Sequence, residues 1–349
     1  MQCVTGSVEV AETSFFKINS QGTPLDETEE SLIKNRRKPI AISARAILRA
    51  GSGHKYWSAF SEEKKKEIET LAEEFHTLLF EPQADSPIKT LDVPLGGSVS
   101  PVDGLSLLIE FLTLAGNREQ QAKAIDAYAD DIAGDGTLSV LKNSLQVLRR
   151  ITGNGPGSLG LHPAVYFYNE RGKYSRFLFL GMTMVVADKL RDNDTNWFKK
   201  FTSARRHIES FLVEHKATLG LILQNMSKSQ RVPKMRDLFG FLVSRPDGGV
   251  TLEEAFDHLG VAGRILELST KETSPRISDD TKSMLFIQEA LSKALRCPIC
   301  NGHLDPRKSV SYDHIERVSD GGLGELKNVQ MAHPYCNTGY KESQSGKMV

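Results

Sequence analysis

Cys297-Pro298-Ile299-Cys300 and, further along the chain, His333-Pro334-Tyr335-Cys336-Asn337 are the two stretches that decide how the C-terminal part of this sequence folds. Each stretch carries a pair of sulfur or imidazole side chains separated by two residues, so each pair can approach one metal ion from a single tight turn. Together the two pairs offer the ligand set of a closed tetrahedral Zn²⁺ site: Cys297, Cys300, His333 and Cys336. The sequence therefore predicts a structural zinc site here.

A second set of polar residues is interleaved with these ligands: Asp313, His314, Asn328 and Asn337. Residues 309–318 are rich in β-branched and aromatic side chains without helical spacing, which predicts a strand. Two glycines at 321–322 supply a turn, and residues 328–332 can form the returning strand. Pro334 suits the first turn of a short helix that carries Cys336, Asn337 and Tyr340. The expected order is strand, loop, strand, helix.

This order and the interleaved residues resemble the HNH endonuclease family, whose ββα-metal fold carries an Asp-His or His-His pair on a strand and an Asn or His on the following helix. The resemblance covers roughly residues 291–343. It implies an endonuclease that uses a divalent cation, and it implies that Asn328 holds the hairpin and orients the base. Arg317 stands where many HNH sequences carry a proline. His333 stands where cysteine is commoner, and imidazole is an ordinary zinc ligand.

The chemistry of phosphodiester hydrolysis assigns the remaining roles. A water molecule must be deprotonated and a cation must neutralise the charge that grows on the phosphoryl oxygens. His314 is the best candidate for the general base, because histidine is largely neutral at physiological pH. Asp313 and Asn337 offer hard carboxylate and carbonyl oxygens to Mg²⁺ or Mn²⁺. We therefore expect these residues to form the catalytic site.

Two alternatives stay open. A zinc ribbon that only binds nucleic acid or protein would explain the four zinc ligands, although it leaves Asp313, His314 and Asn337 unexplained. An RNA-cleaving nuclease would use the same residues as a DNA-cleaving one. His303 is a weaker candidate zinc ligand and is better interpreted as a loop histidine.

Composition and length indicate an ordinary globular protein. The chain has 349 residues, of which 39% are hydrophobic and 25% charged, and its formal net charge is zero. Three of its four cysteines belong to the predicted zinc site, which excludes a disulfide framework and favours a reducing cytoplasm. The longest apolar run, residues 177–187, is too short to span a bilayer and predicts a buried helix. Two basic stretches, residues 34–66 and 199–236, could bind phosphates or could be solvated helix faces.

The N-terminal block, residues 14–29, resembles a signature of GmrSD-type proteins, in which a ParB/sulfiredoxin-like domain often precedes a nuclease domain. It carries Phe15, Ile18-Asn19, Gly22, Leu25 and Glu29 in the spacing of that signature. In that family the nucleotide-handling region lies upstream of this element, and almost nothing precedes Phe15 here. The resemblance implies that a separate ParB/sulfiredoxin-like subunit supplies the missing part, or that the chain lacks its front.

The rest of the chain predicts a mainly α protein with a small C-terminal ββα-metal module. Leucine and isoleucine stripes at 138–151 and 208–226 have helical spacing. Residues 81–101 contain four prolines and two glycines and predict a boundary. We therefore expect three parts: a helical remnant of the GmrSD-type domain at 1–90, a helical middle domain at 101–273 and the HNH domain at 281–349, joined by a tether near 271–280.

Taken together, these observations predict a metal-dependent DNA endonuclease with structural Zn²⁺ and catalytic Mg²⁺ or Mn²⁺. The HNH resemblance implies a cut that leaves a 3′-hydroxyl and a 5′-phosphate, with one strand cut per site. Cleavage of both strands would then require a homo-oligomer or a second attack. The resemblance also implies a role in restriction of foreign or modified DNA, that is, in antiviral defence.

Overall fold

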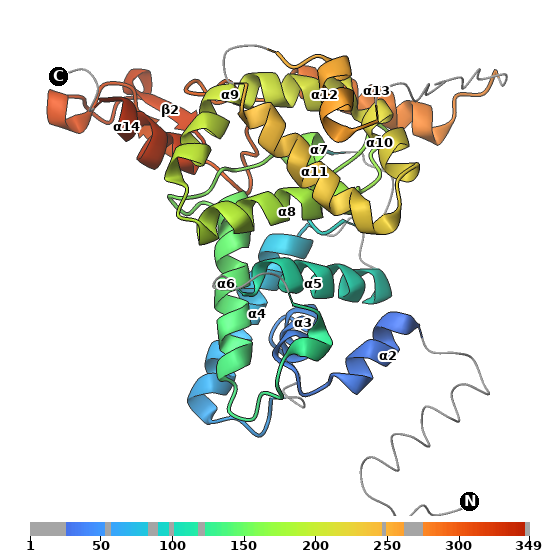
Figure 1. Ribbon diagram of the computed structural model, residues 1–349. Helices are drawn as coiled ribbons and strands as arrows, with labels where there is room; N and C mark the ends of the chain where they lie inside the picture. Colours follow the sequence, from blue (N-terminus) through green and yellow to red (C-terminus); the bar gives the residue numbers. More distant parts are fainter. Residues whose placement is uncertain are drawn as a thin grey trace, which may run out of the picture.

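The computed structural model describes residues 26–52, 57–82, 90–97, 101–117, 123–245, 249–261 and 275–345. Within these residues the chain is mainly helical, and its only sheet is a two-stranded hairpin near the C-terminus, as the sequence predicts. Figure 1 shows the N-terminal helices in one layer, a second layer of helices above it, and the C-terminal hairpin beside that second layer.

The first layer consists of helices α2 to α6. Their bounds are Glu27–Lys34 (α2), Pro39–Leu48 (α3), Glu62–Phe80 (α4), Pro101–Ala115 (α5) and Asp135–Ile151 (α6). Asp26 caps α2 by accepting a hydrogen bond from the Thr28 amide at 2.8 Å. The predicted leucine stripe of α6, from Leu138 to Ile151, is buried.

The second layer consists of helices α7 to α12. Their bounds are Pro163–Tyr166 (α7), Arg176–Arg191 (α8), Thr195–Glu214 (α9), Lys216–Gln224 (α10), Lys228–Val243 (α11) and Leu252–Leu259 (α12). The apolar run at 177–187 lies in α8 and is largely buried against α5, α6 and α11, as predicted. The stripe at 208–226 is divided between α9 and α10, because the chain turns at His215. Thr251 and Glu254 form a capping box at the start of α12.

Helices on both sides of the predicted boundary at 81–101 share one hydrophobic core. α3 packs on α5 and α6, and α4 packs on α6, so the chain returns to the same core after the proline-rich segment. The division of the chain into three parts at 1–90, 101–273 and 281–349 stays a prediction. Residues 271–274 of the predicted tether and residues 14–25 of the N-terminal signature lie outside the described residues, whereas residues 275–280 of the tether are described and lead into a helix that begins at Asp279.

The C-terminal part begins with α13 (Asp279–Ser292) and continues into residues 297–304. These residues carry two of the predicted zinc ligands and are called the metal-binding segment below. Strand β1 (Ser311–His314) pairs antiparallel with β2 (Val329–Ala332), with Asp313 opposite Gln330. A π-helix, η4 (Cys336–Tyr340), and the short helix α14 (Lys341–Ser345) follow. Pro334 occupies the first helical turn before η4, as predicted. Both strands are shorter than expected, because the turn around the two glycines begins earlier.

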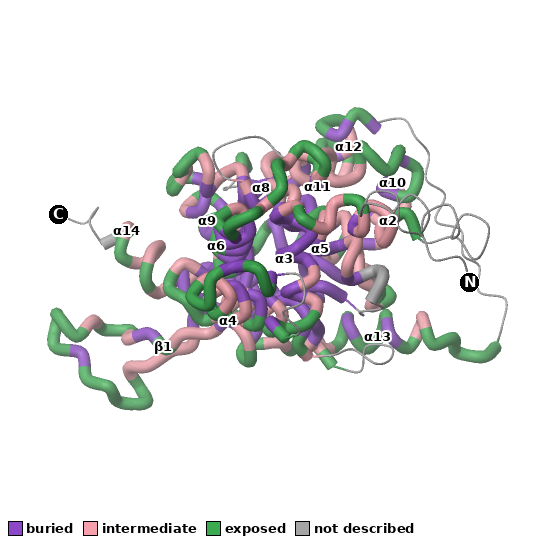
Figure 2. The backbone as a smooth tube through the Cα atoms, turned by 90° about the horizontal axis from the view of Figure 1, so that it is seen from below, coloured by how far each residue is buried: buried purple, intermediate pink, exposed green. Residues whose placement is uncertain are grey.

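Among the described residues, none of the helices combines the length and the apolar character that crossing a bilayer requires. Figure 2 shows that the buried residues concentrate in the helical layers, whereas the loop of the β1–β2 hairpin is mostly exposed. The hairpin loop thus extends from the body of the protein into solvent.

Candidate metal centre and active site

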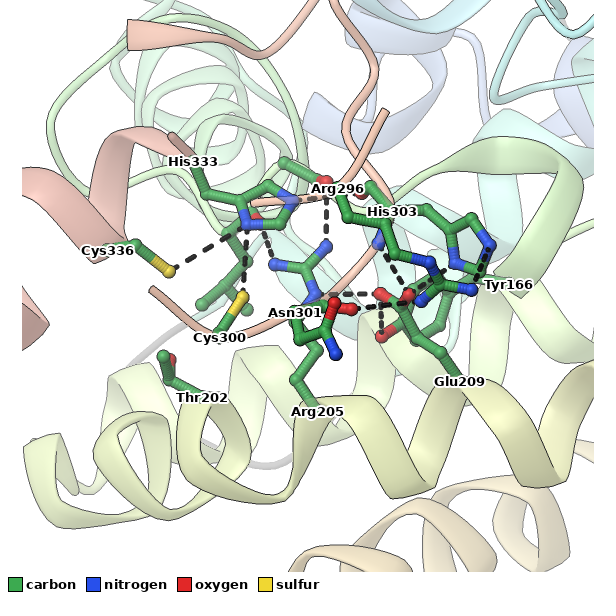
Figure 3. Close-up of polar contacts among 12 residues, drawn as sticks. Tyr166, Thr202, Arg205, Glu209, Arg296, Cys300, Asn301, His303, His333 and Cys336 are labelled. Carbon is green, nitrogen blue, oxygen red and sulfur yellow. Dashed lines mark hydrogen bonds and ion pairs between the residues drawn. The ribbon is translucent and has the colours of Figure 1, made fainter. Parts of the chain in front are cut away.

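The four predicted zinc ligands form one buried cluster. The ligand atoms of Cys297, Cys300, His333 and Cys336 all lie within 4.8 Å of one another. The Nδ1 atom of His333 lies 3.3 Å from the Cys300 sulfur and 3.8 Å from the Cys336 sulfur. Figure 3 shows both sulfur atoms directed toward the His333 ring. Three thiols and one imidazole at these separations are a ligand set that could hold a metal ion.

The protonation of His333 suits metal binding. Its Nε2 atom donates a hydrogen bond to the His303 carbonyl at 2.9 Å, so the lone pair of Nδ1 faces the sulfurs. Metal-bound histidines commonly donate their second ring N–H to a carbonyl in this way. Burial, with the nearby Arg205 guanidinium, lowers the pKa of His333 and keeps the ring neutral. Hydrogen bonding among the thiols lowers the pKa of Cys297 and raises the pKa of Cys300 and of Cys336, so Cys297 is the thiol that most readily forms a thiolate.

His303 is not one of the ligands. Its Nδ1 atom lies 2.6 Å from Oε2 of Glu209, and its Nε2 atom lies 3.1 Å from the Arg296 guanidinium. The ring is therefore held by polar groups on the side away from the sulfurs, and His303 contributes its backbone carbonyl to His333 instead. The interpretation of His303 as a loop histidine agrees with this geometry.

The metal-binding segment rests on a buried ion pair that the sequence did not reveal. Arg205 and Glu209, one turn apart on α9, are 1% and 0% exposed and lie 2.7 Å apart. Arg205 also donates to the carbonyls of Leu159 and Gly160. Glu209 accepts hydrogen bonds from the backbone and ring of His303 (Figure 3). A Cβ at Gly302 would meet Arg205 at 2.5 Å, so the segment lies directly on this pair.

Arg205 had been counted within a basic stretch that could bind phosphates, and its burial excludes that role. Glu209 is hydrogen-bonded to the ring of His303, and the His303 carbonyl is hydrogen-bonded to the ring of His333. These two hydrogen bonds connect helix α9 to the imidazole of the cysteine-histidine cluster. Nothing in the local sequence distinguishes this i,i+4 Arg-Glu pair from a solvated one. The pair is covered by residues distant in the sequence: Leu159, Gly160 and Tyr166 on the N-terminal side, and Gly302 and His303 of the metal-binding segment.

The glycine-rich turn at 153–158 is a second support. Its backbone and side chains bond to the C-terminal part at four places. The Ser158 carbonyl accepts from the Tyr335 amide at 2.9 Å, and Asn154 accepts from the Val310 amide at 2.9 Å. The Pro156 carbonyl accepts from Thr338 at 2.6 Å, and the Gly153 amide donates to the Ser309 hydroxyl at 2.9 Å. The turn anchors the C-terminal part to the end of α6.

Asn328 ties the hairpin loop together. Its side-chain oxygen accepts from the Glu316 amide at 2.7 Å, and its nitrogen donates to the carbonyls of Glu316 at 3.1 Å and Leu323 at 2.8 Å. These three bonds close the loop that follows His314. The geometry fits the hairpin-holding role that the HNH resemblance implies.

Asp313, His314 and Asn337 line one open pocket of about 240 Å³. Tyr312, Arg317, Val318, Ser319, Lys341 and Glu342 complete its lining. The Asp313 residue is 6% exposed, and its carboxylate accepts a hydrogen bond from the side-chain Nε2 of Gln330 at 2.8 Å. The Asn337 nitrogen donates to the Tyr312 carbonyl and to Ser311, both at 3.3 Å. Because the nitrogen is engaged, the amide oxygen of Asn337 is the atom left to serve as a ligand.

Lys341 is the pocket residue that the sequence reasoning missed. Its ammonium group lies 3.0 Å from both carboxylate oxygens of Asp313 and also donates to the His314 carbonyl. Lys341 follows directly on η4, which carries Asn337. π-Helical turns are rare and are often found at functional sites. The spacing of Lys341 from Asn337, one helical turn along the predicted helix, was a signal that could have placed both on the same side.

The comparisons with known proteins agree with this geometry. Residues 297–343 match the family model described as HNH endonuclease, which covers the metal cluster, the hairpin and the pocket residues. The match indicates a nuclease domain and hence a nucleic-acid substrate. No curated protein and no solved structure matches the chain. The N-terminal resemblance to GmrSD-type proteins gains no support from these comparisons.

Proposed function

We propose that this protein is a metal-dependent DNA endonuclease that hydrolyses phosphodiester bonds in the pocket of Asp313, His314 and Asn337. The observation that carries the proposal is the convergence of these three side chains on one pocket within the segment that matches the HNH endonuclease family. A zinc ribbon that only binds a partner has no need for a carboxylate, an imidazole and an amide at a common opening.

Zn²⁺ is the ion that best suits the buried cluster, because three thiolates and one imidazole are soft and borderline ligands. We assign Cys297, Cys300, His333 and Cys336 to it. Its role is structural, since all four ligands are buried and the cluster lies away from the pocket lining. The hairpin and η4 are both attached to this cluster, so its integrity fixes the distance between Asp313 and Asn337.

Mg²⁺ or Mn²⁺ suits the oxygen donors of Asp313 and Asn337. Such an ion, when bound, neutralises the charge that develops on the phosphoryl and leaving oxygens. The protein's own residues supply the rest of the chemistry. His314 accepts a proton from the attacking water, whose oxygen forms a bond to phosphorus while the bond from phosphorus to the 3′-oxygen breaks. The products are a 3′-hydroxyl and a 5′-phosphate, as the family resemblance implies.

Asn328 contributes by closing the loop behind His314. The loop bonds limit the motion of the end of β1, which carries the base and the carboxylate. A role in restriction or antiviral defence rests on the resemblance alone. The same holds for a dimer that cuts both strands and for a ParB/sulfiredoxin-like subunit.

A plasmid-nicking assay tests the proposal. Zinc-loaded protein with Mg²⁺ or Mn²⁺ should convert supercoiled plasmid to the nicked form. His314→Ala should slow this by about 100-fold or more, the usual contribution of a general base. His207→Ala is the matched control, because His207 is an exposed histidine on α9 outside the pocket lining.

The outcomes separate the alternatives. Equal rates for the wild type and His314→Ala, at equal zinc content, would show that another group or a contaminant cuts the plasmid. Cleavage of an RNA hairpin but not of plasmid would show that the substrate is RNA rather than DNA. Binding without cleavage of either, by well-folded protein, would favour the nucleic-acid-binding subunit.

A further inference from the structure

The Asp313 carboxylate already has a cationic partner built into the chain. Lys341 lies 3.0 Å from each of its oxygens, and the side chains of the pair are 20% and 6% exposed. Gln330 donates a further hydrogen bond to Oδ2. The carboxylate thus accepts three hydrogen bonds, and a carboxylate has about four lone-pair sites. One site remains for a metal ion, beside a positive charge.

The ammonium group is held on the pocket side of the hairpin by a second acceptor, the His314 carbonyl. Lys341 is thereby attached to the backbone of the proposed base and to the side chain of the proposed metal ligand. The other charged residues of the pocket lining, Arg317 and Glu342, lie 3.7 Å apart and form a pair of their own. The charges of the pocket lining are therefore balanced before any ion or phosphate arrives.

A divalent cation entering this pocket meets repulsion from Lys341. Like charges within a few ångströms disfavour each other strongly when the site is partly buried, because solvent screens them poorly. A phosphodiester anion has the opposite effect, since it offers the ammonium group a new partner. Lysine is suited to such a change because its charge is carried on a flexible four-carbon stem.

We propose that Lys341 is a resident countercharge that weakens the binding of a divalent cation to Asp313 in the free protein and turns to the phosphate when nucleic acid enters. Cation and substrate then bind cooperatively, because each is held better once the other is present. The inference rests on the proposed function for the identity of the anion. Its first half concerns Asp313 and Lys341 alone.

The test is the affinity of the zinc-loaded full-length protein for Mn²⁺ in the absence of nucleic acid, followed by electron paramagnetic resonance of free Mn²⁺. Lys341→Met keeps the apolar stem and removes the charge. Lys341→Gln keeps N–H donors for the same acceptors and also removes the charge. Both should bind Mn²⁺ about tenfold or more tightly than the wild type, which is the effect expected for a unit charge at this distance.

Lys327→Met is the matched control. Lys327 lies in the loop between β1 and β2, is exposed, and pairs with Glu325 rather than with Asp313. The Lys327→Met variant also removes one positive charge, and it should change the affinity for Mn²⁺ by less than about twofold because solvent screens the Lys327 charge. Lys341→Arg restores the charge and should return the affinity toward the wild-type value.

Unchanged or weaker Mn²⁺ binding by a variant of Lys341 that retains its zinc and its melting temperature would overturn the inference. If Lys341→Met fails to fold, Lys341→Gln decides. The result is independent of cleavage. Tighter Mn²⁺ binding by the variants of a protein that cuts no nucleic acid would support the countercharge role of Lys341 and contradict the proposed nuclease. Cleavage by the wild type, with no gain in Mn²⁺ affinity in the variants, would support the nuclease and contradict the countercharge role.

Discussion

Replacing Glu209 by Gln removes the charge on which the metal-binding segment rests. The carboxylate accepts four hydrogen bonds: from Arg205, from Tyr166, and from the backbone and ring of His303. A glutamine oxygen can retain two of these, and its amide group faces donors at the other two. The variant also leaves the Arg205 guanidinium, which is 1% exposed, without its countercharge.

The magnitude follows from two routes that agree. Two lost hydrogen bonds to a charged group cost about 2 kcal/mol each. Breaking a buried ion pair by removing one partner costs about 3–5 kcal/mol. We therefore expect Glu209→Gln to lower the free energy of unfolding by about 4 kcal/mol. Glu214→Gln, at an exposed position on the same helix, should change it by less than about 0.5 kcal/mol.

Urea unfolding of the zinc-loaded protein measures this loss, and a chelator competition measures a second consequence. Because Glu209 positions His303, and the His303 carbonyl positions His333, the variant should bind zinc about 10- to 100-fold more weakly. A double variant, Arg205→Met with Glu209→Gln, should be less destabilised than the sum of the two single variants, since no lone charge is then buried. A loss below about 1 kcal/mol, or strict additivity, would refute this role of the pair.

Three further predictions concern the metal cluster, the hairpin and the buried histidine. Cys297→Ser or Cys336→Ser should release zinc and unfold the C-terminal part, so stoichiometric zinc after either change would show that the ligands are wrongly assigned. Asn328→Ala should increase amide exchange in the loop that follows His314 and reduce cleavage at unchanged zinc content; unchanged exchange would contradict its loop-closing role. Burial, with the nearby His303, lowers the pKa of His162 to about 3. As pH falls, the unfolded state therefore takes up this proton first, and the free energy of unfolding should fall by about 1 kcal/mol between pH 6.5 and 5.5. His162→Phe should remove this part of the pH dependence, and an equal slope in both proteins would disprove the assignment.

The two-stranded hairpin and the cysteine-histidine cluster that could hold a metal ion were predictable from the sequence because both depend on local spacing. Two residues between paired ligands suit a tight turn, and β-branched residues between them suit a strand. The apolar run in α8 and the stripe in α6 were equally local. The periodicity of α6 decides which face is buried, and the structure buries that face; the continuous apolar run of α8 is buried along nearly its whole length.

The supporting contacts could not be predicted in this way. Arg205 and Glu209 stand at a spacing that is typical of solvated helix faces, and they are buried because segments distant in the sequence, among them Gly302 and His303, pack over them. Lys341 and Asp313 are 28 residues apart in the sequence. Their contact depends on the register of the hairpin and on the π-helix that precedes Lys341. Long-range contacts of this kind carry no periodic signal along the chain.

Anomalous diffraction from crystals of the zinc-loaded protein soaked in Mn²⁺ would test the arrangement of the two metal sites most directly. We predict a zinc peak among Cys297, Cys300, His333 and Cys336, and a separate manganese peak in contact with Asp313 and Asn337. A manganese peak that avoids both oxygen donors, or zinc bound anywhere but the cysteine cluster, would contradict the proposed nuclease site.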